Sequence, residues 1–209
     1  MVRVKVCGIT SLKDGRSAIA CGCQAVGFVF YKKSSRYISP AKACLIIKRL
    51  PRKIIKVGVF VNSSQREARD IARLCKLDML QLHGRQSPGF CRGLRDFKVI
   101  KAFRIKKSPE LKEIKKYNSF AYLFDTYSAK GYGGTGRTFE WKLLQGLRRL
   151  KKPVFLAGGL SQENIGEAIK IVRPDWVDVS SSVEKSPGKK DRRKIKSFIE
   201  AVKRAALYK

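Results

Sequence analysis

Short apolar segments recur along the whole chain, and polar stretches that carry most of the charge separate them. Runs of this length, rich in valine, isoleucine and phenylalanine and bounded by turn residues, predict strands that are buried on both faces. They follow one another at intervals of roughly 20 to 35 residues, the spacing expected of strand–helix units. The expected strands cover residues 2–7, 25–30, 54–61, 77–82, 99–103, 120–124, 153–156 and 175–179.

The polar stretches between these runs predict helices, and several carry recognisable start signals. Ser11 and Ser64 each have an acidic residue three positions later, as in a capping box. Serine followed by proline, which is favoured at a helix N-cap and first position, begins three more helices at residues 39–40, 87–88 and 108–109. The remaining helices are expected at about 139–149, 161–172 and 190–206.

Eight strands alternating with eight helices predict a parallel sheet, because each parallel neighbour is reached through a crossover connection. With eight units, the closed (β/α)8 barrel, or TIM barrel, is the natural arrangement, and an open doubly wound sheet is the structural alternative. The length of 209 residues is short for such a barrel. We therefore expect a single domain over residues 1–209 with few insertions.

The composition is that of a globular protein, with 44% hydrophobic residues. Neither the first residues nor any later run has the apolar length of a signal peptide or a membrane span, so we expect a soluble, cytoplasmic protein with no membrane partner. The six cysteines lie in the first half without zinc-ligand spacing, and one histidine cannot complete a His-rich site. We expect buried free thiols and neither a metal nor another cofactor.

The net charge of +31 is extreme and favours an anionic partner, either a phosphorylated metabolite or nucleic acid. Lysine and arginine nevertheless occur in nearly every expected helix rather than in one block, and no aromatic-interleaved nucleic-acid motif accompanies them. Such a distribution is typical of a lysine-biased proteome, which places cations at most solvent-facing positions. We expect nucleic-acid binding only as incidental polyanion attraction.

The stretch from residue 120 to 141 is the most informative part of the chain. Its apolar run ends in Asp125, one of only 16 acidic residues, where a buried strand meets its loop. The loop is long for a strand-to-helix connection, and such loops are usually lids or binding loops. Turn glycines and an ion-paired aspartate are the simpler interpretation. The loop glycines are Gly131, Gly133, Gly134 and Gly136.

In a (β/α)8 barrel, chemistry lies at the carboxyl ends of the strands. A thiolate at Cys7 can act as a base or nucleophile, and a desolvated Asp125 can act as an acid, so the pair suits an isomerisation that moves protons. The alternatives are a small buried thiol and an ion-paired carboxylate. The residues expected around this mouth are Cys7, Arg36, Asn62, His83, Asp125, Gly158, Gly159, Ser180, Ser181 and Ser182.

Two loops near this mouth suit phosphate binding. Gly158-Gly159 leads into a helix N-terminus, and Ser180-Ser181-Ser182 follows the last strand. Barrels frequently bind phosphate with the loops after strands seven and eight. Arg36 can hold a carboxylate through two parallel hydrogen bonds. We interpret His83 as a structural histidine and leave it out of the catalytic pair.

A series of short motifs extends in order over almost the whole chain. They are KVCGIT at 5–10, GFVF at 27–30, SRYISP at 35–40, GVFVN at 58–62, QLHG at 81–84, FDT at 124–126, GGTG at 133–136, LAGGL at 156–160 and DVSS at 178–181. Together they resemble the phosphoribosylanthranilate isomerase family of tryptophan biosynthesis.

The resemblance implies a (β/α)8 barrel enzyme that converts N-(5-phosphoribosyl)anthranilate into 1-(2-carboxyphenylamino)-1-deoxyribulose 5-phosphate by an Amadori rearrangement. It implies that Asp125 is the general acid that opens the furanose ring to a Schiff base. Cys7 is then the general base that removes the C2 proton, and Arg36 holds the anthranilate carboxylate. The other substrate-binding residues that it implies are Gly134, Thr135 and Gly136 in a covering loop, Gly158, Gly159, Ser181 and Ser182 at the phosphate, and Asp178 at the amine or ribose.

One position departs from the family pattern, which usually has glycine where this chain has Ser182. Serine there would matter if the position needs a positive φ or a close approach of the phosphate. The alternative functions are another phosphosugar-binding barrel enzyme of tryptophan or histidine biosynthesis, or a non-catalytic basic protein that binds polyanions. The sequence is compatible with a monomer or a homodimer.

Overall fold

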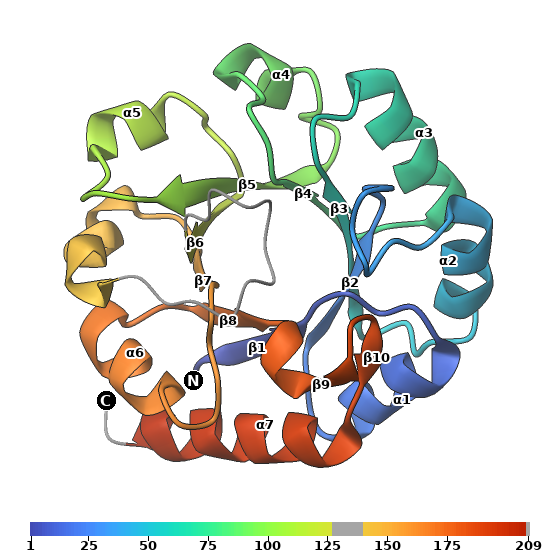
Figure 1. The fold of residues 1–209 in the computed structure, drawn as a ribbon. Coiled ribbons are helices and arrows are strands. Elements are labelled where there is room, and N and C mark those ends of the chain that lie inside the picture. Colours follow the sequence, from blue (N-terminus) through green and yellow to red (C-terminus); the bar gives the residue numbers. More distant parts are fainter. Residues whose placement is uncertain (127–139, 208–209) are drawn as a thin grey trace.

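Eight parallel strands form a closed barrel in sequence order in the computed structural model, which describes residues 1–126 and 140–207. The eighth strand pairs with the first, so the predicted (β/α)8 barrel is confirmed and the open sheet is excluded. Figure 1 looks along the barrel axis and shows the helices as an outer ring. The strands are β1 (Arg3–Val6), β2 (Ala25–Val29), β3 (Ile55–Phe60), β4 (Met79–Leu82), β5 (Lys98–Ile105), β6 (Ala121–Thr126), β7 (Val154–Leu156) and β8 (Trp176–Val179).

Several of the predicted helix start signals are confirmed. The hydroxyls of Ser11, Ser39, Ser64 and Ser87 each accept a hydrogen bond from the backbone N–H three residues later, at 3.1 to 3.4 Å. Each bond satisfies a donor that the first helical turn leaves unpaired. The helices are α1 (Leu12–Ala20), α2 (Pro40–Ile47), α3 (Gln65–Cys75), α4 (Pro88–Arg92), α5 (Leu111–Lys115), α6 (Ile165–Val172) and α7 (Arg192–Leu207).

Two other predicted helix starts are wrong. The Ser108 hydroxyl donates to the backbone carbonyl of Leu143 at 3.1 Å, and α5 begins only at Leu111. At Ser161 the backbone N–H donates to the Asn164 side chain at 2.8 Å, and α6 starts after that asparagine. In both cases a tertiary or turn contact replaces the helix cap that the local sequence predicts.

The connection after β6 also differs from the helix predicted at 139–149. From residue 140 onward it contains two short 3-10 helices, η1 (Trp141–Leu144) and η2 (Leu147–Leu150). Gly146 lies between them with a φ of +86°. A residue in this left-handed conformation ends a helical turn, so the glycine divides the predicted helix.

A hairpin that the sequence analysis did not predict follows β8. After the 3-10 turn η3 (Ser181–Val183), strands β9 (Glu184–Ser186) and β10 (Lys189–Lys190) pair antiparallel before α7 begins. Gly188 turns the hairpin with a φ of +79°, and a Cβ there would lie 3.0 Å from the backbone oxygen of Ser35. The hairpin therefore packs tightly against the loop that follows β2.

Side chains fill the barrel interior. Near the amino ends of the strands, Phe155 stacks on Trp176 with ring centroids 5.0 Å apart, and the Arg3 guanidinium lies 4.4 Å from the centre of the Trp176 ring. Near the carboxyl ends, Cys7 packs with Val29 and Val59 in a small separate cluster. All three residues of this cluster line the pocket at the carboxyl ends of the strands.

Two expectations from composition concern the thiols and membranes. All six cysteines are free and five of them are buried, as predicted; Cys21 is partly exposed. In the part of the chain that the structure describes, no helix is long and apolar enough to cross a bilayer.

Candidate active site

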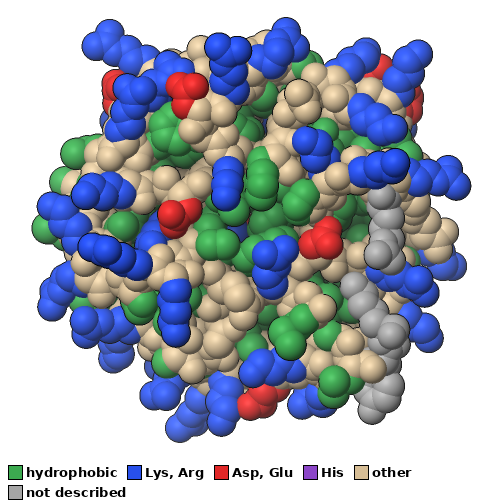
Figure 2. Space-filling model, turned by 180° about the vertical axis from the view of Figure 1, so that it is seen from behind, with side chains coloured by type: hydrophobic (Ala, Val, Ile, Leu, Met, Phe, Trp, Pro, Cys, Tyr) green, Lys and Arg blue, Asp and Glu red, His purple; other side chains and the backbone are tan. Residues whose placement is uncertain are grey.

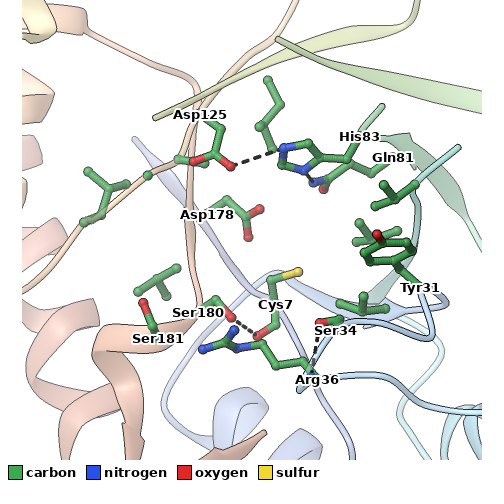
Figure 3. A pocket seen from close by; sticks show the side chains of 18 of the residues that line it. Cys7, Tyr31, Ser34, Arg36, Gln81, His83, Asp125, Asp178, Ser180 and Ser181 are labelled. Atoms are coloured by element: carbon green, nitrogen blue, oxygen red, sulfur yellow. Dashed lines mark hydrogen bonds and ion pairs between the residues drawn. The ribbon is translucent and has the colours of Figure 1, made fainter. Parts of the chain in front are cut away.

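A pocket opens at the carboxyl ends of the strands, where the sequence predicts the functional residues (Figure 3). Its wall is built from distant parts of the chain that the barrel brings together. Nine of the predicted residues line it: Cys7, Arg36, His83, Asp125, Gly158, Gly159, Asp178, Ser180 and Ser181. Asn62, also expected around the mouth, does not line it, and Tyr31, Ser34 and Gln81 contribute in addition.

The carboxylate of Asp125 lies near the end of β6 and faces a histidine from the loop after β4. The Asp125 side chain is buried, and its Oδ2 lies 3.3 Å from Nε2 of His83 (Figure 3). Gln81, at the end of β4, places its amide nitrogen 3.5 Å from the other ring nitrogen of His83. The interpretation of His83 as a structural residue missed this contact, because it depends on two strands that are far apart in sequence.

The thiol of Cys7 lies beside a buried ion pair. Lys5 and Asp178 are register partners on β1 and β8, and the Lys5 Nζ donates to Asp178 Oδ2 at 2.7 Å. Lys5 also contacts the Cys7 thiol. Burial raises the pKa of Cys7, and the charge of Lys5 opposes this rise. Burial likewise raises the pKa of Asp178 against the opposing charge of Lys5.

Asp178 retains one unused acceptor. Its Oδ1 is buried and has no hydrogen-bond partner among the described residues, although the side chain lines the pocket. A buried carboxylate oxygen without a donor is costly, so the arrangement favours a ligand that supplies one. The sequence analysis predicted Asp178 as a contact of the amine or ribose but missed its partner, Lys5.

Lys5 could have been recognised from the strand pattern. It lies on β1 at the same parity as Cys7, and strands of a parallel barrel are buried on both faces. A lysine in the middle of such a strand is expected to be buried, and a buried lysine needs a partner. Gly27 of β2 makes room for both side chains, since a Cβ there would lie 2.7 Å from the Cys7 Sγ and 3.2 Å from the Lys5 Cε.

Arg36 reaches the pocket from the loop after β2 and is paired with a carboxylate of the unpredicted hairpin. Its Nε and Nη2 donate to the two oxygens of Glu184 at 2.9 and 2.7 Å. The arginine stem crosses over Gly8, where a Cβ would lie 2.7 Å from the Arg36 Cδ. Burial favours a higher pKa for Glu184, but the hydrogen bonds from Arg36 and the charge of Lys190 outweigh it and lower the pKa.

The loops after β7 and β8 form one side of the pocket. Gly158 and Gly159 have φ values of +91° and +64°, so their backbone turns into the pocket without side chains. Ser181 begins η3, and the Ser180 hydroxyl donates to the backbone oxygen of Cys7 at 3.1 Å. Backbone of this kind, beside Cys7, is suited to close contact with an anion.

Two further predictions about binding residues have different outcomes. Ser182 does not line the pocket; its hydroxyl donates to the backbone oxygen of Leu160, in the loop after β7. Its φ is not positive, so serine in place of the family glycine strains no backbone here. Gly134, Thr135 and Gly136 lie outside the described residues.

Comparisons with known proteins agree with this geometry. Residues 4–201 match the family model of N-(5'-phosphoribosyl)anthranilate (PRA) isomerase. The N-(5'-phosphoribosyl)anthranilate isomerase of Geobacter sulfurreducens is 46% identical over 203 residues, which cover 97% of this chain and 99% of that protein.

Solved structures are equally similar. The phosphoribosyl anthranilate isomerase of Thermotoga maritima superposes with a TM-score of 0.91 at 45% identity, covering 97% of this chain and 99% of that chain. A phosphoribosyl anthranilate isomerase solved in complex with reduced 1-(o-carboxyphenylamino)-1-deoxyribulose 5-phosphate gives a TM-score of 0.87 at 42% identity, with the same coverage. With a matching family model and relatives at this identity over nearly its whole length, the chain belongs to the phosphoribosylanthranilate isomerase family.

Proposed function

We propose that this protein converts N-(5'-phosphoribosyl)anthranilate into 1-(2-carboxyphenylamino)-1-deoxyribulose 5-phosphate, the Amadori rearrangement that the sequence motifs imply. One observation carries the proposal: Cys7 and Asp125, from strands far apart in the chain, line one pocket beside two loops suited to phosphate. An acid and a base that reach the same sugar are what this rearrangement requires.

The first step is assigned to Asp125. In its protonated form it donates a proton to the furanose ring oxygen, the C1–O bond breaks, and the lone pair of the aryl nitrogen forms a C=N bond to C1. His83, with Nε2 3.3 Å from the carboxylate, is placed to return a proton to Asp125 after the step. The buried position of Asp125 keeps bulk water away from this transfer.

The second step is assigned to Cys7. As a thiolate it removes the proton from C2, the C–H electrons form a C1=C2 double bond, and the iminium nitrogen recovers its lone pair. The resulting enolamine becomes the ketone when the C2 hydroxyl loses its proton and C1 gains one. Lys5 supplies the neighbouring positive charge that favours the thiolate over the thiol.

Substrate binding is assigned to the remaining pocket residues. Gly158, Gly159 and Ser181 hold the phosphate through their backbone, and Arg36 holds the anthranilate carboxylate. The unpartnered Oδ1 of Asp178 accepts a hydrogen bond from the amine or a ribose hydroxyl. These contacts orient C1 and C2 between the acid and the base.

Turnover of the substrate by the purified protein tests the proposal. Anthranilate derivatives are fluorescent, so conversion is followed as a change in emission. We expect conversion without an added cofactor. A protein that leaves this substrate unchanged but acts on another phosphosugar in a substrate screen would instead support the alternative barrel enzymes of tryptophan or histidine biosynthesis.

A further inference from the structure

A buried network of charges underlies the Arg36 side of the pocket. Both oxygens of Glu184 accept hydrogen bonds from Arg36, and Oε1 also accepts one from the Lys190 Nζ at 2.8 Å. The Lys190 Nζ donates further to the backbone oxygen of Ser180 at 3.1 Å. The exposed fractions of the Arg36, Glu184 and Lys190 side chains are 13%, 4% and 0%.

This network contains more positive than negative charge. Two cations share one carboxylate, and burial lowers the pKa of Lys190 against the opposing charge of Glu184. An excess charge away from water is stabilised when a counter-ion binds beside it. Of the three side chains only Arg36 lines the pocket, so an anion that enters there meets the network through the guanidinium.

The geometry of the pair fixes how that guanidinium is presented. Glu184 occupies the guanidinium edge formed by Nε and Nη2. The edge that carries Nη1 stays open, and Nη1 has no hydrogen-bond partner among the described residues. The planar fork of arginine binds a carboxylate through two parallel bonds on one edge. An arginine held by one carboxylate is therefore oriented to receive a second.

We propose that Glu184 is a positioning residue that orients Arg36 toward the carboxylate of the substrate and thereby sets the selectivity for a carboxyl-bearing aryl group. Lys190 anchors Glu184 from the opposite side and keeps the network positively charged. This inference rests on the proposed function, which assigns the carboxylate to Arg36. It gives the β9–β10 hairpin a role, because that hairpin contributes both Glu184 and Lys190.

Binding of two matched ligands tests the proposal. The first is reduced 1-(o-carboxyphenylamino)-1-deoxyribulose 5-phosphate, and the second is the same compound with a phenyl ring that lacks the carboxyl group. Dissociation constants are measured by calorimetry for the wild type, Glu184→Gln, Arg36→Met and the double variant. Glu200→Gln, at an exposed carboxylate of α7, is the matched control.

Glutamine at position 184 can accept only one of the two arginine hydrogen bonds and presents a donor to the other. We expect Glu184→Gln to weaken binding of the carboxylated ligand about tenfold, the usual cost of a charged hydrogen bond, and to leave the phenyl ligand unchanged. The double variant should bind no more weakly than Arg36→Met, because Glu184 acts through Arg36. Glu200→Gln should match the wild type for both ligands.

Other outcomes distinguish the positioning role of Glu184 from the carboxylate contact of Arg36. Equal weakening of both ligands by Glu184→Gln, or tighter binding of the carboxylated ligand through the added positive charge, overturns the positioning role. If Arg36→Met binds both ligands like the wild type, the proposed contact between Arg36 and the carboxylate is itself overturned. If Glu184→Gln does not fold, Glu184→Asp gives the same comparison, because its shorter side chain keeps the charge but cannot reach both arginine nitrogens.

Discussion

The Cys7 thiol illustrates how single residues set the chemistry of this site. Burial raises its pKa, which opposes its use as a base, while the adjacent Lys5 charge acts in the other direction. Lys5 in turn keeps its charge because Asp178 is 2.7 Å away, and its pKa is raised even though burial alone would lower it. The reactivity of one side chain therefore depends on two others that do not donate or accept the transferred proton.

The pH dependence of turnover reports on this arrangement. A general base must be deprotonated, so kcat/KM should decrease as the pH falls below the raised pKa of Cys7. Lys5→Met removes the opposing charge and so raises the pKa of Cys7 further. We therefore expect the limb on the low-pH side of the profile, where kcat/KM rises with pH, to move to higher pH.

The measurement is a kcat/KM profile across neutral and alkaline pH, with Lys13→Met at an exposed position of α1 as the control. Because Lys5→Met leaves Asp178 buried without its cation, thermal unfolding is recorded in parallel. A limb that stays in place or moves to lower pH contradicts the role of Lys5.

Lys101 is another buried lysine, on β5, and its burial makes the stability of the fold depend on pH. Its Nζ donates to the backbone oxygens of Gly84 and Ala102 at 2.7 and 3.1 Å, and burial lowers its pKa to about 8. The unfolded chain, with the ordinary lysine pKa, binds a proton more readily between this value and about pH 10.4. The contribution of Lys101 to folding therefore improves as the pH rises through this window.

Chemical denaturation of the wild type and Lys101→Met at several pH values checks this prediction. The difference in unfolding free energy should shift in favour of the wild type by on the order of 3 kcal/mol between pH 8 and 10.4. A difference that is independent of pH contradicts the lowered pKa.

At the level of elements, Ser182 links the two loops that follow β7 and β8, which are proposed to hold the phosphate. Its hydroxyl, in η3, donates to the backbone oxygen of Leu160 in the loop after β7. The resemblance to the family identifies glycine as the usual residue at this position. Where the family has glycine, this chain therefore has a side chain that links the loop after β7 to the loop after β8. These loops contain Gly159 and Ser181.

Ser182→Gly should loosen this connection without touching the acid or the base. Loss of one hydrogen bond predicts an increase in KM of about two- to tenfold with kcat unchanged. Steady-state kinetics together with competition by inorganic phosphate measure the effect, and Ser197→Gly, on α7 and outside the pocket, controls for added backbone freedom. A variant with an unchanged KM and phosphate affinity shows that the bond does not support the loops.

The strands were predictable because most of their positions are buried and apolar, although β1, β3 and β5 also carry lysines. Four helix starts were predictable because serine caps act within one turn. Local rules failed where tertiary contacts decide. Gly146 divides a stretch that has the apolar content of a helix. The β9–β10 hairpin has no alternating pattern, and it is held by Arg36 and by the Thr10 hydroxyl, which donates to Gly188.

The same distinction holds for the candidate site. Cys7, Asp125 and the Gly158-Gly159 pair could be found because they end apolar runs, and the barrel rule places such ends around one mouth. His83 and Glu184 could not be assigned, since their significance lies in partners far away in the sequence. The role of Ser182 likewise became visible only through its contact with Leu160.

For the whole molecule, the most unusual property is the net charge of +31. Figure 2 shows lysine and arginine side chains spread over the face seen from behind, with few acidic side chains among them. This distribution agrees with a general cationic surface rather than one dedicated patch. Its expected effect is on encounter with small anions, because a positive field increases their association rate at low ionic strength.

Salt should therefore lower the rate at which the protein captures its substrate. With a substrate that carries a phosphate and a carboxylate, kcat/KM should fall as sodium chloride is raised, while kcat stays nearly constant. The measurement compares steady-state kinetics at about 0.01 M and 0.15 M salt, where the Debye length changes from about 30 to 8 Å. A parallel series with sucrose, which raises the viscosity and slows diffusion without screening charge, separates electrostatic steering from a general change in diffusion. A kcat/KM that does not respond to salt contradicts the steering.

The proposed reaction depends on an acid and a base that act on one substrate in one pocket. Turnover of N-(5'-phosphoribosyl)anthranilate by Cys7→Ala and Asp125→Asn, with Cys21→Ala and Asp70→Asn as controls outside the pocket, tests it most directly. Each of the two pocket variants should lose at least about 100-fold in kcat while still binding the reduced product analogue, and both controls should turn over like the wild type. Full activity in either pocket variant would contradict the assignment of acid and base.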